Sequence, residues 1–172
     1  GSVLMRIILL NAAVFVLALL VKLGLIFGVQ SMEKANVLFS VFVSWLTVPY
    51  SLGELIWKPW TVITYMFFHY DIWHIFWNML FLYWFGKLLT DIAGNRKVLP
   101  VYVYGGLAGM TLSIFAYYLF PGLPIGNSML GASAAVYAVM LASATLMPDY
   151  KFHLMFIGPV SIKWIVLFRF VA

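Results

Sequence analysis

Residues 68–79 read FHYDIWHIFWNM and place two polar residues, His74 and Asn78, four positions apart in a strongly apolar run. Residues four apart share one face of an α-helix, so both side chains would point at the same spot. A third polar residue in an apolar setting is Ser133, which lies in Gly131-Ala132-Ser133-Ala134. A polar group inside a membrane segment is expensive and marks a functional site by default. The three residues together predict a serine hydrolase site within a membrane.

The composition supports a membrane protein. The 172 residues are 65% hydrophobic and 9% charged, whereas soluble domains contain about 45–50% apolar residues. We therefore expect an all-α, polytopic transmembrane bundle that forms a single domain over residues 1–172. The net charge of +5 comes from Lys and Arg scattered singly between apolar runs. A nucleic-acid-binding protein would gather them on one exposed face, so the expected partner is the lipid bilayer and not nucleic acid.

The apolar runs predict four spanning helices, at about 7–27, 71–89, 99–120 and 133–147, and a partial fifth from about Ser161 or Ile162. Asp71 is a plausible N-cap for the second. The fourth helix would be roughly 22 Å long, which is shorter than a hydrocarbon core of about 30 Å. Ser133 would then lie below the membrane surface, and residues 121–130 should help to form a wet pocket over it.

The connections between these helices set the orientation. The densest basic cluster is the loop expected between the second and third helices, which we place in the cytoplasm; it carries Lys87, Asp91, Arg96 and Lys97. The N-terminus is then cytoplasmic, and His74 and Ser133 lie near the outer face. Residues 28–61 should lie partly in the interface, and residues 148–160 should form a cytoplasmic connection. Gly105 and Gly109 form a small-xxx-small pair that would let a neighbouring helix approach closely.

The chemistry expected of these residues is acyl transfer. Such a reaction needs a nucleophile, a base, and donors aimed at the developing oxyanion. Ser133 would be the nucleophile, and its backbone N–H at a helix N-terminus has no intrahelical partner. His74 and Asn78 would add side-chain donors to this oxyanion site. Gly131 would allow a backbone conformation that other residues avoid.

Structural alternatives exist for each residue. A membrane serine commonly bonds only a helix carbonyl, and His74 with Asn78 could form an interhelical bond. The nearest set of metal ligands is His69, Asp71, His74 and His153. Its spacing is not His-Glu-x-x-His, and His153 is expected one membrane crossing away. We therefore expect neither a metal nor an organic cofactor.

Two stretches carry a resemblance to a known family. Residues 68–79 and LGASAAVYA at 130–138 resemble the two signature motifs of the rhomboid intramembrane serine proteases, and the likeness runs from about residue 60 to 147. The resemblance implies a six-helix bundle with a Ser–His dyad between the fourth and sixth helices. It assigns Ser133 as nucleophile and His74, Asn78 and the Ser133 backbone as the oxyanion site, and it implies that the long first loop lies partly in the outer leaflet.

The chain departs from the family pattern at three places. Ala134 stands where a glycine usually follows the nucleophile, a small-for-small change beside Gly131 that we expect to be tolerated. Trp60-Thr61 stands in place of the Trp-Arg pair of the first loop. The family's general base comes from the sixth helix, whereas this chain ends in the fifth, and neither His69 nor His153 replaces it. We expect a base histidine on a sixth helix beyond Ala172, without which the chain as given would be inactive.

The predicted activity is that of a serine endopeptidase. It would cleave transmembrane segments of membrane proteins near the outer leaflet, through an acyl-enzyme on Ser133, and would favour helix-breaking substrate residues. The expected location is a bacterial inner membrane. The alternative is a catalytically inactive rhomboid-like protein that binds membrane clients. A channel or transporter is disfavoured because buried carboxylates and repeat symmetry are lacking.

Overall fold

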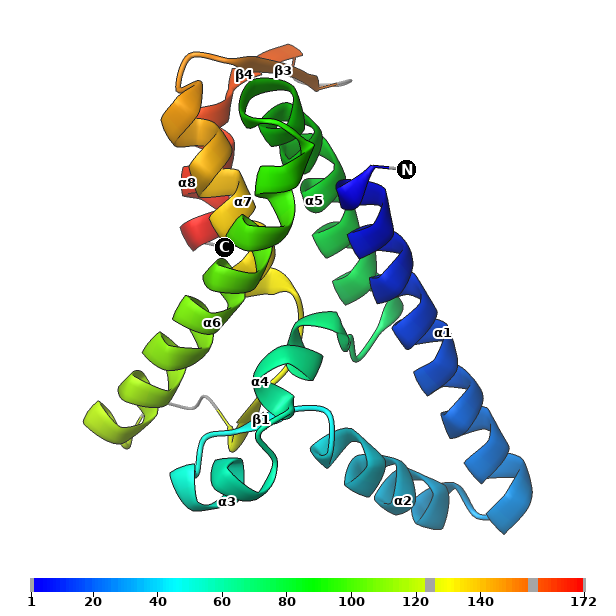
Figure 1. Cartoon of the computed structure of the whole chain (residues 1–172). Coiled ribbons are helices and arrows are strands. Elements are labelled where there is room, and N and C mark those ends of the chain that lie inside the picture. Colours follow the sequence, from blue (N-terminus) through cyan, green and yellow to red (C-terminus); the bar gives the residue numbers. More distant parts are fainter. Residues whose placement is uncertain (1, 123–125, 155–157, 172) are drawn as a thin grey trace.

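A computed structural model describes residues 2–122, 126–154 and 158–171. The fold is a helical bundle with a few short strands (Figure 1). The elements, in chain order, are α1 (Val3–Val29), α2 (Met32–Ser44), β1 (Val48–Pro49), α3 (Leu52–Trp57), α4 (Thr61–Thr64), the 3-10 helix η1 (Tyr65–Phe67), α5 (Ile72–Ala93), α6 (Asn95–Leu119), β2 (Ser128–Met129), α7 (Ser133–Leu146), β3 (Lys151–Leu154), β4 (Gly158–Ser161) and α8 (Ile162–Val171). The expected all-α transmembrane class is confirmed.

The long helices lie where the sequence predicts them, although α1, α5 and α6 are each longer than the predicted ranges. Among the described residues, α1 and α6 are long and apolar enough to cross a membrane. Helix α5 has 22 residues, or about 33 Å, so it also reaches across a hydrocarbon core. Helix α7 has only 14 residues, or about 21 Å, as predicted. Its first residue, Ser133, is half-buried.

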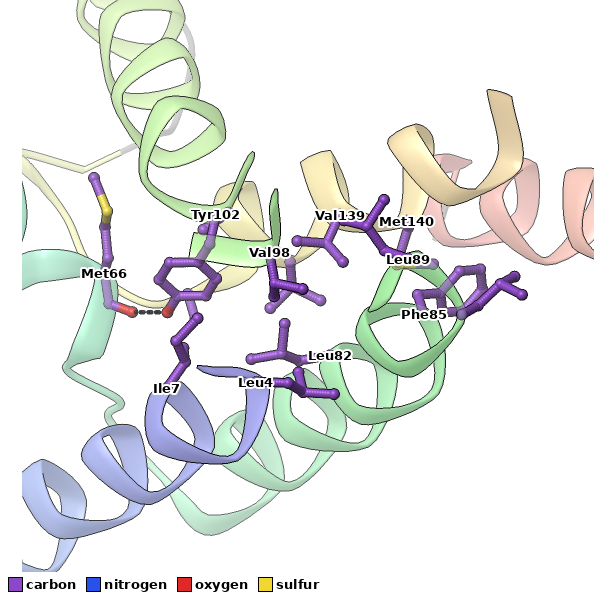
Figure 2. Packing of buried hydrophobic residues seen from close by; sticks show 14 of the residues in the cluster. Leu4, Ile7, Met66, Leu82, Phe85, Leu89, Val98, Tyr102, Val139 and Met140 are labelled. Carbon is purple, nitrogen blue, oxygen red and sulfur yellow. Dashed lines mark hydrogen bonds between the residues drawn. The ribbon is translucent and has the colours of Figure 1, made fainter. Parts of the chain in front are cut away.

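Helices α5, α6 and α7 pack closely because small residues line the contact between α6 and α7. A Cβ on Gly105 would collide with the side chain of Ala138, and one on Gly109 with that of Ala134. The predicted close approach at this glycine pair is confirmed. Figure 2 shows the apolar core beside this contact, with labelled side chains from α1 (Leu4, Ile7), α5 (Leu82, Phe85, Leu89), α6 (Val98, Tyr102) and α7 (Val139, Met140).

Buried hydrogen bonds join the core to α1 and to η1. The Tyr102 hydroxyl donates to the Met66 carbonyl at 2.8 Å (Figure 2). The Asn11 Nδ2 donates to the Ile7 carbonyl at 2.9 Å and lies 3.3 Å from the Tyr102 hydroxyl. The Tyr65 hydroxyl donates to the Gly106 carbonyl at 2.6 Å. Such bonds hold helices together where no water competes for the polar groups.

The first connection folds across one end of the bundle (Figure 1). Its strand β1 pairs with β2, so that Val48 lies opposite Met129. The Trp60 indole N–H donates to the Trp45 carbonyl at 2.8 Å, and the two rings stack with centroids 5.8 Å apart. The Thr61 hydroxyl donates to the Lys58 carbonyl at 2.6 Å. These contacts hold this part of the first connection together.

One predicted loop is wrong. Lys87 and Asp91 lie on α5, and Arg96 and Lys97 lie on α6, so Gly94 alone separates the two helices. Gly94 has φ 91°, a left-handed conformation that breaks the helix and that glycine adopts readily. The four charged side chains are exposed on the helix ends.

Two further details differ from the prediction or refine it. The expected connection at 148–160 contains the antiparallel pair β3–β4, which the sequence analysis did not identify. The Val3 backbone N–H donates to the Asn95 side chain at 2.8 Å, which places the start of α1 at the same end of the bundle as the α5–α6 junction.

Candidate active site

Ser133 and His74 meet although 59 residues separate them in the chain. Ser133 is the first residue of α7, and His74 lies in the first turn of α5. The Nε2 atom of His74 is 3.3 Å from the Oγ atom of Ser133, and either atom can donate, depending on the tautomer of the imidazole. Both residues are half-buried. The fold therefore brings a hydroxyl and an imidazole together at the N-terminus of α7.

The start of α5 holds His74 in place. The Asp71 carboxylate accepts a hydrogen bond from the His74 backbone N–H at 2.9 Å, so the predicted N-cap is confirmed. One turn later the Asn78 Nδ2 donates to the His74 carbonyl at 3.0 Å. An amide carries two hydrogens on this nitrogen, so a second N–H remains for another acceptor. The Asn78 Oδ1 is buried and has no hydrogen-bond partner among the described residues.

Gly131 shapes the space that the His74 ring occupies. Its φ of 104° is a conformation that residues with a side chain rarely adopt. A Cβ at this position would lie 2.6 Å from the Cε1 atom of His74. The Gly131 N–H donates to the Tyr65 carbonyl at 2.9 Å, which fixes the turn that leads into α7. Ala134, the residue after Ser133, packs against Gly109. A larger side chain at either position would push α6 away from α7.

A second histidine lies beside this pair. His69 is buried in the loop before α5, and its ring packs edge-on against His74 with centroids 5.0 Å apart. Neither of its ring nitrogens has a hydrogen-bond partner among the described residues. Burial, with His74 nearby, lowers the pKa of His69 to about 4, so its imidazole is neutral at pH 7. The contact between His69 and His74 was not predicted from the sequence.

The other candidate residues from the sequence lie away from the Ser133–His74 pair or have structural roles. His153 lies on β3, at the end of the bundle where α5 finishes, whereas His74 lies where α5 begins (Figure 1). Within the described ranges, no group of three or more His, Cys, Asp or Glu residues gathers as metal ligands. Ser143, on the same helix as Ser133, lies 2.9 Å from the Phe85 carbonyl and 2.8 Å from the Val139 carbonyl, which is a structural role.

The predicted wet pocket over Ser133 stays a prediction. Residues 123–125 of its loop lie outside the described residues, and residues 126–128 are exposed. Strand β2, in the same loop, is tied to β1, and the Tyr50 N–H donates to the Asn127 carbonyl at 3.0 Å. This part of the loop is therefore anchored to the first connection.

Comparison with known proteins identifies relatives of the chain. RHOMBOID-like protein 12, mitochondrial, from Arabidopsis thaliana is 34% identical over 119 residues, which cover 63% of this chain and 35% of that protein. Rhomboid protein 1, mitochondrial, from Saccharomyces cerevisiae is 32% identical over 113 residues, covering 65% and 32%. Presenilin-associated rhomboid-like protein A, mitochondrial, from Danio rerio is 30% identical over 97 residues, covering 55% and 24%.

These relatives bear on the location of the protein. The chain spans about a third of the length of the first two relatives and about a quarter of the third. The names of all three contain the word mitochondrial, so they give no support to the predicted bacterial inner membrane.

A family match covers most of the chain. The Rhomboid domain matches residues 56–172, which include both motifs and all of α5 to α8. The chain belongs to the rhomboid family.

Proposed function

We propose that the protein carrying this chain is an intramembrane serine endopeptidase with Ser133 as its nucleophile. The observation that supports this most is the 3.3 Å contact between the Ser133 Oγ and the His74 Nε2 atoms. Two separate helices bring these groups together at a helix N-terminus, where backbone N–H groups lack intrahelical partners. Ser143 shows the contrasting, purely structural arrangement on the same helix.

The proposed chemistry begins with attack of the Ser133 Oγ on a substrate carbonyl carbon. The carbonyl oxygen gains negative charge, and the donors proposed for it are the Ser133 backbone N–H, the His74 Nε2–H and the second N–H of Asn78. The base takes the Ser133 hydroxyl proton during this attack and passes it to the nitrogen as the C–N bond breaks, which leaves an acyl-enzyme on Ser133 and a free amine. Water hydrolyses the acyl-enzyme and regenerates the serine.

His74 serves in this scheme as a donor and not as the base. An imidazole whose Nε2 carries hydrogen cannot accept a proton at the same atom. A serine without a base is a weak nucleophile, so the scheme needs a separate base. The family resemblance assigns this role to a histidine on a sixth helix, and our proposal includes that histidine.

The substrates proposed are transmembrane segments of membrane proteins. Ser133 lies at the N-terminus of the short helix α7, which we propose to be below the membrane surface. A substrate would therefore have to unwind there and present an extended backbone to Ser133. Helix-breaking residues near the scissile bond would ease this step. No metal or organic cofactor is part of the scheme.

The proposed orientation has the N-terminus in the cytoplasm or the equivalent compartment. The end of the bundle with the start of α1 and the α5–α6 junction carries Arg6, Lys87, Arg96 and Lys97. Basic residues favour the cytoplasmic side, so the site faces the outer half of the membrane. The names of the relatives give no support to a bacterial inner membrane in particular. We therefore propose only a membrane whose proteins carry their basic residues on the cytoplasmic or equivalent side, and a bacterial inner membrane is one candidate.

The experiment is cleavage of a transmembrane reporter by the purified protein in vesicles, with products identified by mass spectrometry. We expect cleavage by the wild type and by Ser133→Ala at most a thousandth of that rate, because the nucleophile is lost. The matched control is Ser143→Ala on the same helix, which should retain cleavage.

Two results would count against the proposal. Cleavage by Ser133→Ala at the wild-type rate would exclude Ser133 as nucleophile. Retention of the reporter by both proteins without any cleavage would favour the alternative, an inactive rhomboid-like protein that binds membrane clients.

A further inference from the structure

A cleft of about 550 Å³ lies between α1, α2 and the loop before α5. Its volume falls in the range of about 300–1,000 Å³ that small-molecule sites occupy. The lining residues used below are Lys22, Asn36, Ser40, Tyr70 and Ser128. None of them belongs to the proposed catalytic site, so the inference does not depend on the role of Ser133.

Helix α2 turns its polar side toward this cleft. Asn36, Ser40 and Ser44 follow one another at intervals of four and all line the cleft, whereas Val37 and Val41 are 58% and 53% exposed. An amphipathic helix at a membrane surface normally turns its polar face to water. The polar side chains of α2 that line the cleft are likewise exposed, so they offer hydrogen-bonding groups to an occupant of the cleft.

Lys22 gives the cleft a positive charge. Its ammonium lies 5.4 Å from the centre of the Phe39 ring on α2. Within the described residues the one salt bridge joins Lys163 and Asp149, so no carboxylate neutralises Lys22 there. Among the described residues that line this cleft, Lys22 is the only Lys, Arg, Asp or Glu. An anion is therefore the occupant that fits its charge.

The depth of Lys22 matches the headgroup boundary of a bilayer. It is six residues from Val16, the middle residue of α1, or about 9 Å along the axis. Half of a hydrocarbon core is about 15 Å, and a lysine side chain snorkels outward over most of the remaining distance. With the middle of α1 at the middle of the bilayer, the ammonium would reach the boundary at which the lipid headgroups begin.

An apolar chamber continues from the polar cleft. A second cavity of about 370 Å³ shares Lys22, Phe39 and Tyr70 with the first. Its further lining includes Phe15, Leu19 and the buried His69, and the ring nitrogens of His69 have no partner among the described residues. Asp71 also lines this second cavity and is the one carboxylate there, but its Oδ1 accepts from the His74 N–H.

We propose that the cleft between α1 and α2 binds the phosphate of a membrane phospholipid, with an acyl chain in the apolar chamber. Lys22 pairs with the phosphate, while Asn36, Tyr70 and Ser128 supply N–H and O–H donors to its several oxygens. A carboxylate has fewer oxygens and would leave some of these donors without an acceptor. The lipid would fill the space between α1, α2 and the loop before α5.

The test is native mass spectrometry of the protein in detergent with added phosphatidylglycerol. Wild type should retain one lipid, and Lys22→Met should lower the affinity about tenfold, because a charge-assisted bond to phosphate is lost. Lys22→Arg keeps the cation and should restore binding to within about threefold of wild type. The matched control is Lys34→Met on α2, which removes an equal charge outside the cleft and should change the affinity less than twofold.

Three ligands separate the possible occupants. A diacylglycerol with the same chains, oleate and inorganic phosphate should each bind at least tenfold more weakly than phosphatidylglycerol. Equal binding of diacylglycerol or oleate would overturn the assignment to phosphate, and equal binding of inorganic phosphate would overturn the assignment to a lipid. Unchanged lipid binding by Lys22→Met would overturn the site itself. A melting temperature of Lys22→Met equal to wild type in lipid-free detergent excludes misfolding as the cause of a loss.

Discussion

The two sides of the bundle are built in opposite ways. Between α6 and α7 the helices approach so closely that a Cβ on Gly105 or Gly109 would collide with an alanine. Between α1, α2 and the loop before α5, by contrast, the structure leaves a cleft that Lys22, Asn36 and Ser40 help to line. The close side carries Ser133 at the start of α7, and the open side carries no residue of the proposed catalytic site.

This difference suggests a division of labour. A reaction geometry has to be held to within a fraction of an ångström, which close packing on rigid elements provides. A cleft that takes a lipid has to stay open and polar, so it is built from an amphipathic helix over a single cation. Substitutions should therefore lower the free energy of unfolding strongly on the α6–α7 side and only slightly on the α1–α2 side.

The largest effect is expected from Gly105→Leu, which inserts a branched side chain where α6 meets Ala138. Overpacking of a core costs about 1–3 kcal/mol and occasionally more, and we expect the upper end because backbone has to move. The measurement is the free energy of unfolding in detergent. Ala108→Leu, on an exposed position of the same helix, is the control and should change it by less than about 0.5 kcal/mol. Equal losses in both variants would contradict the close packing.

The next effect is expected from Gly131→Ala, whose methyl group would collide with the His74 ring. The rate of Ser133 labelling by a fluorophosphonate should fall at least tenfold, because His74 is displaced. Gly126→Ala separates this effect from backbone strain, since Gly126 also has a positive φ, of 72°, but no atom within 4 Å of the added Cβ. A similar fall in both variants would show that strain, and not the contact with His74, controls the rate.

A moderate effect is expected from Tyr102→Phe. The hydroxyl is buried and donates to the Met66 carbonyl, and its loss leaves that acceptor without its donor. The free energy of unfolding should fall by about 1 kcal/mol. Tyr104→Phe removes a hydroxyl from a residue of α6 that is 71% exposed and should have no measurable effect. A loss as large from Tyr104→Phe would contradict the assigned bond.

The smallest effect is expected from Ser40→Ala on α2. This change also removes one hydroxyl, but Ser40 is exposed and its Oγ donates only to the Val37 carbonyl of its own helix. The free energy of unfolding should change by less than about 0.5 kcal/mol. A loss equal to that of Tyr102→Phe would contradict the assigned difference between a buried interhelical hydroxyl and an exposed hydroxyl of α2.

The features that the sequence predicted well are local. The apolar run from Ser133 with Pro148 after it predicted α7 to within one residue of its end, Leu146. Asp71 before an apolar run predicted the N-cap of α5. The glycine spacing at Gly105 and Gly109 predicted the close contact, because residues four apart lie on one face of a helix.

The features that the sequence did not predict depend on distant partners or on a single residue. The pairs Val48–Met129 and Pro49–Ser128 join segments about 80 residues apart, and strands of two residues carry no periodic pattern. The β3–β4 pair is similarly short. The charged residues around Gly94 predict a loop, because charged side chains are common in exposed loops. Here they are exposed side chains at the ends of two helices, and the backbone around them is helical. The contact of His69 with His74 depends on how the loop before α5 folds back, which local sequence does not encode.

The most direct test of the central claim is the site of labelling by a fluorophosphonate probe in the protein that carries this chain. The Ser133 Oγ displaces fluoride from phosphorus and loses its proton, so the reaction reports an activated serine and needs no known substrate. Peptide mapping should find the label on Ser133 of the wild type and none on Ser133→Ala, while Ser143→Ala stays labelled. The absence of label from a wild type that carries a sixth-helix histidine, or label that persists in Ser133→Ala, would contradict the account.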